Sequence, residues 1–239
     1  MKITDYTLSA TTNKDVKFVF ISDLHGYDNN KILNEIDKIN PDAVLASGDM
    51  VHDDKNYKDG IEFLRLCSEK YPTFCSLGNH EMKLSVDIRA MIRESGATLL
   101  DNEYTEYMGI KIGGLSTGYQ QGDKQGRTKT TPYPNMEFAN SFAKENGYKI
   151  LLSHHPEYYG KYLKDLDINL ILSGHAHGGQ WRFFGRGVFA PGQGLFPKYT
   201  SGMYDNKLIV SRGIGNQMLV PRINNSKEII ALNFKSEEK

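Results

Sequence analysis

The sequence has little cysteine and no long apolar run. Its two cysteines, Cys67 and Cys75, lie in apolar surroundings without C-x-x-C spacing, which excludes a metal site built from thiolates alone. We expect both to be buried, reduced thiols. No segment approaches the roughly 18 apolar residues needed to span a bilayer, and residues 1–10 contain neither a signal-type apolar core nor twin arginines. The sequence therefore predicts a cytoplasmic protein with no membrane span.

An excess of charge of either sign is also missing. Lysine plus arginine and aspartate plus glutamate each number 29, so the formal net charge is zero. Such a chain has no global field that attracts nucleic acid or an anionic membrane, although local patches can exist, and we expect no stable nucleic-acid partner. The 239 residues are 39% hydrophobic, with no internal repeat or linker. This predicts a single domain over residues 1–239.

Apolar segments alternate with amphipathic ones through the first 94 residues. Strands are expected where apolar residues run together, and helices where they recur every three or four positions. The alternation predicts crossover units on a largely parallel sheet. The expected strands are 3–9, 17–21, 43–46 and 73–77, and the expected helices lie between Asp28 and Asn40, at 57–70 and at 84–94.

Shorter strands follow and predict a second, more antiparallel sheet. The chain thus has the pattern of an α/β (α+β) fold with two sheets. In this part the strands are expected at 97–100, 104–108, 110–115, 149–152, 168–172, 207–211, 217–220 and 228–234, with helices at 136–146 and 157–164.

Polar residues suited to metal binding follow five of the expected strands. Ligands of parallel sheets gather at the carboxyl ends of the strands, so we expect these residues to meet. Glycines beside them let the backbone turn sharply. The residues are, in chain order, Asp23 and His25, Asp49, Asn79 and His80, His154 and His155, and His175 and His177.

Seven of these side chains exceed the needs of one tetrahedral ion. Their mixed oxygen and imidazole donors suit two divalent ions such as Mn, Fe, Zn, Co or Ni, rather than Ca or Mg. Two ions ~3.5 to 4 Å apart can generate hydroxide and clamp the oxygens of an in-line displacement at phosphorus. His80 is then placed to protonate the leaving oxygen. The seven are Asp23, His25, Asp49, Asn79, His154, His175 and His177, and His155 could replace His154.

The order of these motifs resembles the calcineurin-like metallophosphoesterase family, and the Gly-rich segment beyond them resembles its bacterial YkuE-like subgroup. The resemblance implies a four-layer sandwich of two mixed sheets flanked by helices. The motifs are Asp23-x-His25, Gly48-Asp49, Gly78-Asn79-His80-Glu81, His154, Gly174-His175-x-His177 and Ser211-Arg212-Gly213.

The same resemblance implies roles for these positions. One ion would be held by Asp23, His25 and His177, and the other by Asn79, His154 and His175. Asp49 would bridge the two ions, and a hydroxide between them would attack a phosphodiester or phosphomonoester while His80 assists the leaving group. The expected partner is thus a small phosphoester substrate.

One position departs from the family pattern. Many members carry an Asp three residues after the bridging Asp to orient the catalytic His, whereas this chain has His52 there, followed by Asp53. Either could orient His80, and His52 could also contact the substrate phosphate or lie in a surface loop. Arg182 and Arg212 could bind phosphate bidentately or form ordinary ion pairs.

Two segments are candidates for substrate selection. Residues 118–135 are polar and carry cations, and residues 182–204 are rich in Gly and aromatics. The alternatives to a hydrolase are a non-catalytic scaffold of the same fold and a nuclease. The presence of all seven ligands and His80 argues against a scaffold, and the zero net charge argues against a nuclease.

Overall fold

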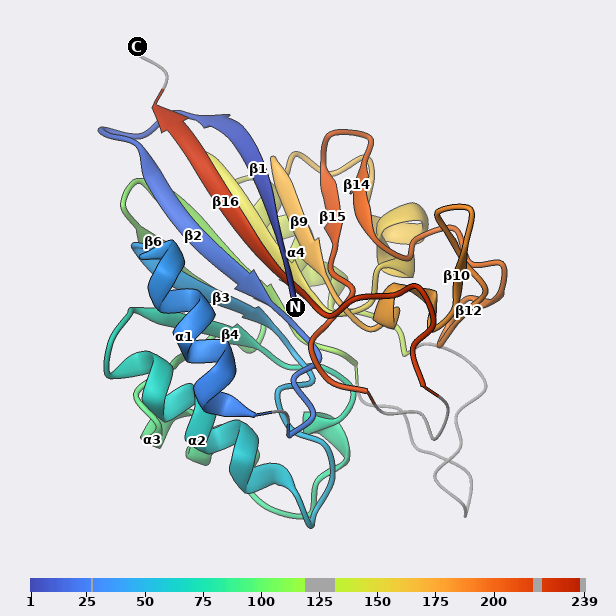
Figure 1. The fold of residues 1–239 in the computed structure, drawn as a ribbon. Coiled ribbons are helices and arrows are strands. Elements are labelled where there is room, and N and C mark those ends of the chain that lie inside the picture. The colour runs from blue at the N-terminus through green and yellow to red at the C-terminus, as the bar shows by residue number, and fades with distance from the viewer. Residues whose placement is uncertain (27, 119–131, 217–220, 237–239) are drawn as a thin grey trace.

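The computed structural model describes residues 1–26, 28–118, 132–216 and 221–236, and two six-stranded sheets form its centre (Figure 1). Apolar side chains from both sheets, among them Phe18, Phe20, Ile150 and Leu172, pack into one buried cluster between the sheets. This confirms the expected sandwich of two stacked mixed sheets.

The first sheet has the strand order β1-β16-β2-β3-β4-β5. Neighbouring strands are parallel except at the β16–β2 pair, so β16 from the end of the chain separates β1 from β2. The bounds are β1 Lys2–Ala10, β2 Val16–Ile21, β3 Ala43–Ser47, β4 Thr73–Ser76, β5 Thr98–Leu99 and β16 Glu228–Ser236.

The second sheet has the order β14-β15-β9-β8-β7-β6. Its two outer pairs are antiparallel and its three inner pairs are parallel, so it is more antiparallel than the first sheet, as expected. The bounds are β6 Glu103–Tyr107, β7 Ile110–Leu115, β8 Tyr148–Ser153, β9 Leu170–Ser173, β14 Gly202–Tyr204 and β15 Leu208–Val210.

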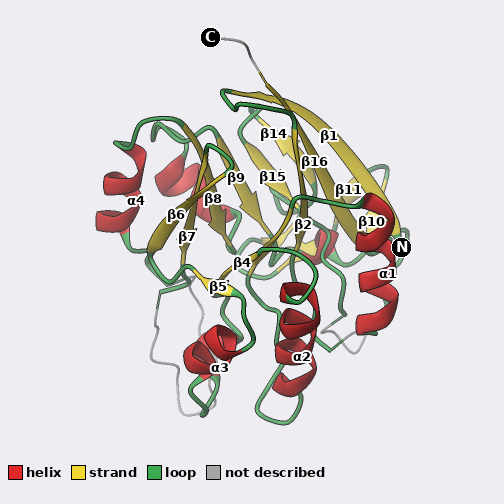
Figure 2. Cartoon of the chain, turned by 90° about the vertical axis from the view of Figure 1, so that its left-hand side faces the viewer, coloured by secondary structure: helices red, strands yellow, loops and turns green. Residues whose placement is uncertain are grey.

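Helices cover the outer face of each sheet and complete the four layers (Figure 2). Helices α1 (Asn29–Ile39), α2 (Tyr57–Ser68) and α3 (Ile88–Glu94) pack on the first sheet, and α4 (Met136–Ala143) packs on the second. The carboxylate of Asp28 caps α1 by accepting a hydrogen bond from Lys31 N, and Asn40 ends it in the left-handed conformation. Among the described residues, no helix has the length and apolarity to cross a bilayer.

Several expected bounds were wrong at the ends of elements. Helix α3 begins at Ile88 rather than residue 84, because Asp87 caps it and residues 81–83 form a separate 3-10 turn, η1. Helix α4 ends at Ala143 rather than residue 146, and the expected helix at 157–164 is a single π-turn, η2, over Tyr159–Leu163. The expected strand at 217–220 and most of the 118–135 loop lie outside the described residues.

Short hairpins follow β9. A 3-10 turn, η3 (His177–Gly179), leads into the β10–β11 hairpin and then into the β12–β13 hairpin. These four strands are β10 Arg182–Phe183, β11 Arg186–Gly187, β12 Phe189–Ala190 and β13 Gly194–Leu195.

We predict that neither cysteine reacts with a thiol reagent while the protein is folded. Burial raises the pKa of the Cys67 thiol to about 12, and burial raises the pKa of Cys75 as well. Because the thiolate is the reacting form, both thiols should be inert toward dithionitrobenzoate at pH 8. In denaturant the assay should count both; rapid reaction of either thiol in the folded protein would contradict their placement in the core.

Candidate metal centre

The carboxyl ends of β2, β3, β4, β8 and β9 bring the predicted residues together. Two glycines permit the close approach. A Cβ on Gly78 would lie 2.3 Å from Asp49 Oδ1, and a Cβ on Gly174 would lie 2.4 Å from Asp23 Oδ2. Only glycine fits such positions, so these residues set how closely the strand ends can meet.

One group of possible ligands consists of Asp23, His25 and His177, whose ligand atoms lie within 4.8 Å of one another. Asp23 Oδ1 is 3.5 Å from His177 Nε2 and 3.9 Å from His25 Nε2. The backbone N–H of His175 donates to both oxygens of Asp23, at 3.0 and 3.1 Å. This bifurcated bond fixes the carboxylate that faces the two imidazoles.

A second group consists of Asp49, His154 and His175. His154 Nδ1 lies 2.8 Å from the carbonyl oxygen of Ser47, which directs Nε2 toward Asp49 Oδ2 at 3.0 Å. Asp49 Oδ2 is also 3.8 Å from His25 Nε2 of the first group. Asp49 is therefore the residue that adjoins both groups.

The donor set fits divalent ions. Asn79 Oδ1 is buried and has no hydrogen-bond partner among the described residues, as expected of an acceptor kept for a cation. The remaining donors are carboxylates and imidazoles, which suit transition metals. The structure thus brings the seven predicted ligand residues to one edge of the sandwich.

Five of these residues have left-handed backbones. Positive φ values are uncommon for residues other than glycine, and each costs of order 1 to 3 kcal/mol where the conformation is strained. A concentration of such residues at one place is typical of a functional site. The values are 52° for Asp23, 46° for His25, 53° for Asp49, 62° for His175 and 46° for His177.

Burial determines the protonation of the imidazoles. It lowers the pKa of His25, His175 and His177, so these rings are neutral at pH 7 and can each offer a lone pair to a metal. For His154 burial acts in the same direction, but the charge of Asp49, its hydrogen bond to His154 and the charges of Asp23 and Glu81 together outweigh it and raise the pKa to about 10. In the absence of metal, a proton on His154 therefore neutralises Asp49.

His80 lies beside Asp49 in a fixed orientation. Its backbone N–H donates to Asp49 Oδ1 at 2.9 Å, and its Nδ1 contacts the carbonyl oxygen of His52. The Nε2 atom then lies 4.0 Å from Asp49 Oδ2. Asp53 is half exposed, and its carboxylate accepts from the backbone of Lys55 instead. The His52 carbonyl thus contacts His80 Nδ1, and the His52 ring stacks on the His80 ring at a centroid distance of 5.6 Å.

The structure separates His154 from His155. His155 pairs with Glu157, with His155 Nδ1 3.4 Å from Glu157 Oε1. Its ring packs on that of His175 at a centroid distance of 4.2 Å. His155 thus supports the neighbouring imidazole, and His154 is the member of the pair that faces Asp49.

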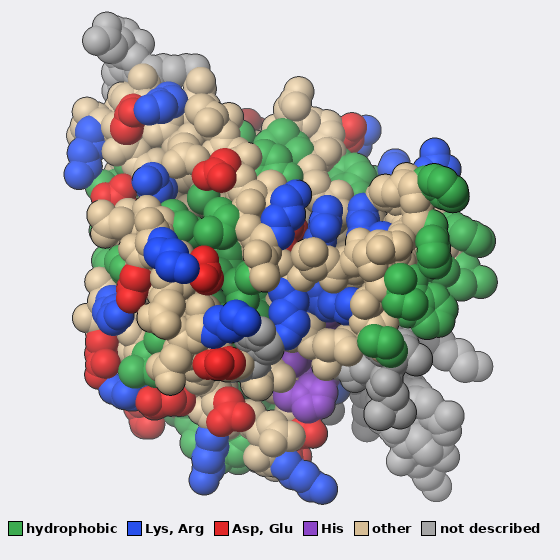
Figure 3. Space-filling view, in the orientation of Figure 1, with side chains coloured by type: hydrophobic (Ala, Val, Ile, Leu, Met, Phe, Trp, Pro, Cys, Tyr) green, Lys and Arg blue, Asp and Glu red, His purple; other side chains and the backbone are tan. Residues whose placement is uncertain are grey.

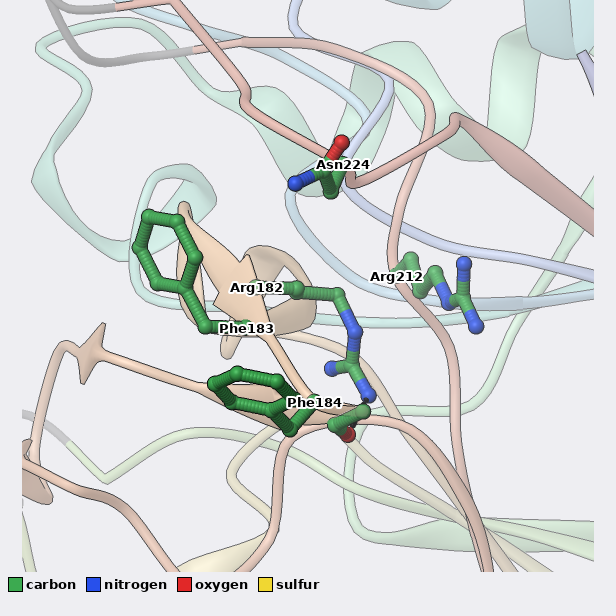
Figure 4. Close-up of a pocket in the computed structure, with 6 residues that line it drawn as sticks. Arg182, Phe183, Phe184, Arg212 and Asn224 are labelled. Atoms are coloured by element: carbon green, nitrogen blue, oxygen red, sulfur yellow. Dashed lines mark hydrogen bonds between the residues drawn. The ribbon is translucent and has the colours of Figure 1, made fainter.

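The arginines proposed as phosphate ligands differ in their surroundings. The Arg182 guanidinium donates to the Gly178 carbonyl at 2.7 Å and to Thr200 Oγ1 at 3.2 Å, so it ties together the loops after η3. Arg212 Nε has no hydrogen-bond partner among the described residues. Both arginines line a pocket of about 450 Å³ with Phe183, Phe184, Gly185 and Asn224 (Figure 4).

Sequence reasoning missed Arg222. Its guanidinium donates to the carbonyl oxygen of Arg212 at 2.7 Å and lies 3.3 Å from His177 Nδ1. Burial lowers its pKa to about 10, so it stays charged at neutral pH. Arg222 lies in a loop without periodic pattern, and nothing in the sequence alone indicates its contact with a candidate ligand 45 positions away.

Sequence reasoning assigned no role to Glu81, although it lies in the Gly78-Asn79-His80-Glu81 motif. Its buried carboxylate accepts backbone hydrogen bonds from Asp49, Met50, Val51 and Gly78, at 2.8 to 3.2 Å. Four donors from two strand ends converge on one side chain. Glu81 therefore holds the ends of β3 and β4 together beneath Asp49.

The fold and the paired ligand groups define a two-sheet α/β protein with a candidate metal centre at its strand ends. The sequence profile of the calcineurin-like phosphoesterases matches residues 16–179, more than half of the chain, and the chain belongs to this family. This confirms the resemblance drawn from the motifs.

Curated relatives agree with this assignment. An uncharacterized metallophosphoesterase of Campylobacter jejuni is 30% identical over 94% of this chain, and YkuE of Bacillus subtilis is 27% identical over 86%. The phosphodiesterase YaeI of Escherichia coli is 28% identical over 74%. The matches cover 60%, 72% and 64% of these relatives, so the chain spans little more than half the length of the Campylobacter protein.

Solved structures support the fold. The chain resembles the calcineurin-like phosphoesterase YfkN of Bacillus subtilis with a TM-score of 0.51 at 15% identity, covering 84% of this chain and 82% of YfkN. It resembles the phosphopantetheinyl hydrolase of Mycobacterium tuberculosis with a TM-score of 0.52 at 13% identity, covering 87% and 91%. At such identities the likeness concerns the fold alone.

We predict that Glu81→Gln destabilises the metal-free protein by about 2 to 4 kcal/mol, because the amide presents its own N–H groups to backbone donors in a buried site. Urea unfolding after removal of metal measures this directly. Glu62→Gln is the matched control, since Glu62 is half exposed and pairs with Arg65 on the surface of α2. Equal midpoints for the two variants would show that Glu81 does not hold the strand ends.

Proposed function

We propose that the protein is a metal-dependent hydrolase of phosphodiesters or phosphomonoesters that uses two divalent transition-metal ions. The observation that carries this proposal is the pair of three-residue ligand groups that meet at Asp49. Membership of the calcineurin-like phosphoesterase family supports it, as does the name of the Escherichia coli relative, a phosphodiesterase.

In this proposal the two groups each hold one ion. Asp23, His25 and His177 would hold the first, and Asn79, His154 and His175 the second, with Asp49 shared between them. Mn, Fe, Zn, Co and Ni all suit these donors. When bound, such ions lower the pKa of a water molecule and compensate negative charge on a phosphate.

The chain's own residues position the substrate and move a proton. With its Nδ1 against the His52 carbonyl, His80 presents Nε2 toward the centre and can donate a proton from that atom to the leaving oxygen. The partly exposed His52 ring stacks on the His80 ring at 5.6 Å, where it can contact the phosphate from the solvent side.

Arg212 is the better placed of the two arginines to bind a further anionic group of the substrate. Its Nε makes no hydrogen bond among the described residues and lies 4.0 Å from Glu228 Oε1, whereas the Arg182 guanidinium already donates to Gly178 and Thr200. In this proposal Arg212 contacts the substrate in the pocket of Figure 4, and Arg182 holds the pocket wall in place.

Elemental analysis and a turnover screen test the proposal together. Protein purified without chelators should contain two transition-metal ions per chain, and Mn-loaded protein should hydrolyse part of a panel of nucleotides, phosphodiesters and small monoesters. Asp49→Ala should lose metal and activity, because both groups lose their shared carboxylate. One ion or fewer per chain, unchanged by added Mn or Zn, would overturn the dinuclear arrangement.

We predict that His80→Ala retains its metals but loses about 10² to 10⁴-fold in kcat, the usual contribution of a positioned general acid. The loss should be smaller for nitrophenyl esters, whose leaving group needs little protonation, than for alkyl esters. Steady-state kinetics with both ester types checks this. Equal losses would mean that His80 stabilises charge rather than donating a proton.

A further inference from the structure

Exposed hydrophobic side chains gather at one edge of the molecule, on the hairpins β10–β11 and β12–β13. Figure 3 shows hydrophobic side chains along the right-hand edge, where Figure 1 places β10 and β12. We call this surface the apolar rim. Its members are Phe183, Phe184, Phe189, Leu195 and Phe196, which are 50%, 105%, 37%, 70% and 80% exposed.

The local fold does not require apolar residues at these positions. Phe184 and Gly185 form the two-residue tip of the β10–β11 hairpin, and both have positive φ, 50° and 79°. Such a turn favours Asn-Gly, and a bulky aromatic is an outlier there. Phe196 also has a φ of 50°. Apolar side chains that are both exposed and unfavourable for the backbone indicate a binding surface.

The charge of this region differs from that of the whole chain. Residues 168–227 contain seven lysines and arginines and a single acid, Asp205, although the complete chain is neutral. Asp205 is already engaged, with its Oδ2 3.3 Å from Lys164 Nζ and 3.0 Å from the Tyr159 hydroxyl. The rest of the chain is correspondingly acidic, so the positive charge of the chain is concentrated in this segment.

Two of these cations lie on or next to the hairpins of the apolar rim. Arg186 belongs to β11 and Lys198 follows β13, and both are exposed. Lysine and arginine side chains also lie between the rim and the rest of the face shown in Figure 3. Projecting aromatic side chains bordered by cations are complementary to an anionic bilayer, where the rings enter the interface and the cations meet the headgroups.

We propose that the apolar rim, together with Arg186 and Lys198, docks the protein onto the surface of an anionic phospholipid bilayer. Charge complementarity selects this occupant over a purely apolar protein partner, which would gain nothing from the surrounding cations. Docking does not require catalysis, so it is independent of the proposed hydrolase function. It would hold the metal centre near the membrane, because only four residues separate His177 from Arg182, where β10 begins.

Vesicle co-sedimentation of the full chain tests this proposal. We expect binding to phosphatidylcholine vesicles containing about one-third phosphatidylglycerol, much weaker binding to phosphatidylcholine alone, and loss of binding in high salt. Phe184→Ser/Phe196→Ser should weaken vesicle binding roughly ten-fold or more, because two aromatic rings that would enter the bilayer are removed. Arg186→Glu/Lys198→Glu should weaken it by a similar factor.

Matched controls separate the rim from general surface effects. Tyr104→Ser removes an exposed aromatic from β6, at the far edge of the second sheet, and Lys58→Glu reverses an exposed charge on α2. Both should bind the anionic vesicles as the unchanged chain does. All variants should keep the thermal unfolding midpoint of the unchanged chain, which excludes loss of binding through misfolding.

Three results would overturn the proposal. The first is absence of binding to the anionic vesicles, and the second is undiminished binding by Phe184→Ser/Phe196→Ser. The third is self-association of the unchanged chain that this variant abolishes without any vesicle binding, which would make the rim an interface between copies. Asp49→Ala, which should lack metal, should still bind vesicles, so failure of the hydrolase proposal would leave this test intact.

Discussion

Two carboxylates with almost no exposure to water, Asp23 and Asp49, set the main constraint on this structure. A buried charge is costly unless hydrogen bonds, opposite charge or a metal compensates it. The backbone N–H groups of His175 and His80 compensate part of it, at 3.0 Å to Asp23 and 2.9 Å to Asp49. In the metal-free protein, the proton on His154 neutralises Asp49. The strand ends can therefore close over these carboxylates only in the arrangement that also assembles the ligand groups.

The same constraint connects metal binding to folding. Five of the seven candidate ligand residues have left-handed backbones, a conformation that the surrounding packing has to impose. Glu81 imposes part of it by fixing the ends of β3 and β4, and Gly78 and Gly174 allow the close contacts. A metal that binds only the folded state would compensate the buried carboxylates, and its binding free energy would add to the stability of the fold.

The sequence predicted the parts of the site that depend on local order. Strands that lead to Asp49 or His175 can be recognised from apolar runs followed by glycine and polar residues. Contacts between segments distant in the chain could not be predicted in this way. The insertion of β16 between β1 and β2 depends on tertiary pairing, as does the contact of Arg222 with His177. The His52 carbonyl that contacts His80 is a backbone group, and every residue has one, so the residue type does not reveal this contact.

Hydrogen bonds at the base of the hairpins separate the candidate metal centre from the exposed hairpin tips. The last candidate ligand, His177, begins η3, and Asn225 Nδ2 donates to the carbonyl oxygens of His177 and Gln180 at 2.7 and 3.1 Å. Arg182 ties the same turn to Thr200. These bonds anchor the base of the hairpins, so their tips can carry exposed aromatics without disturbing the ligands. The same bonds connect the base of the hairpins directly to the turn that carries the last candidate ligand residue.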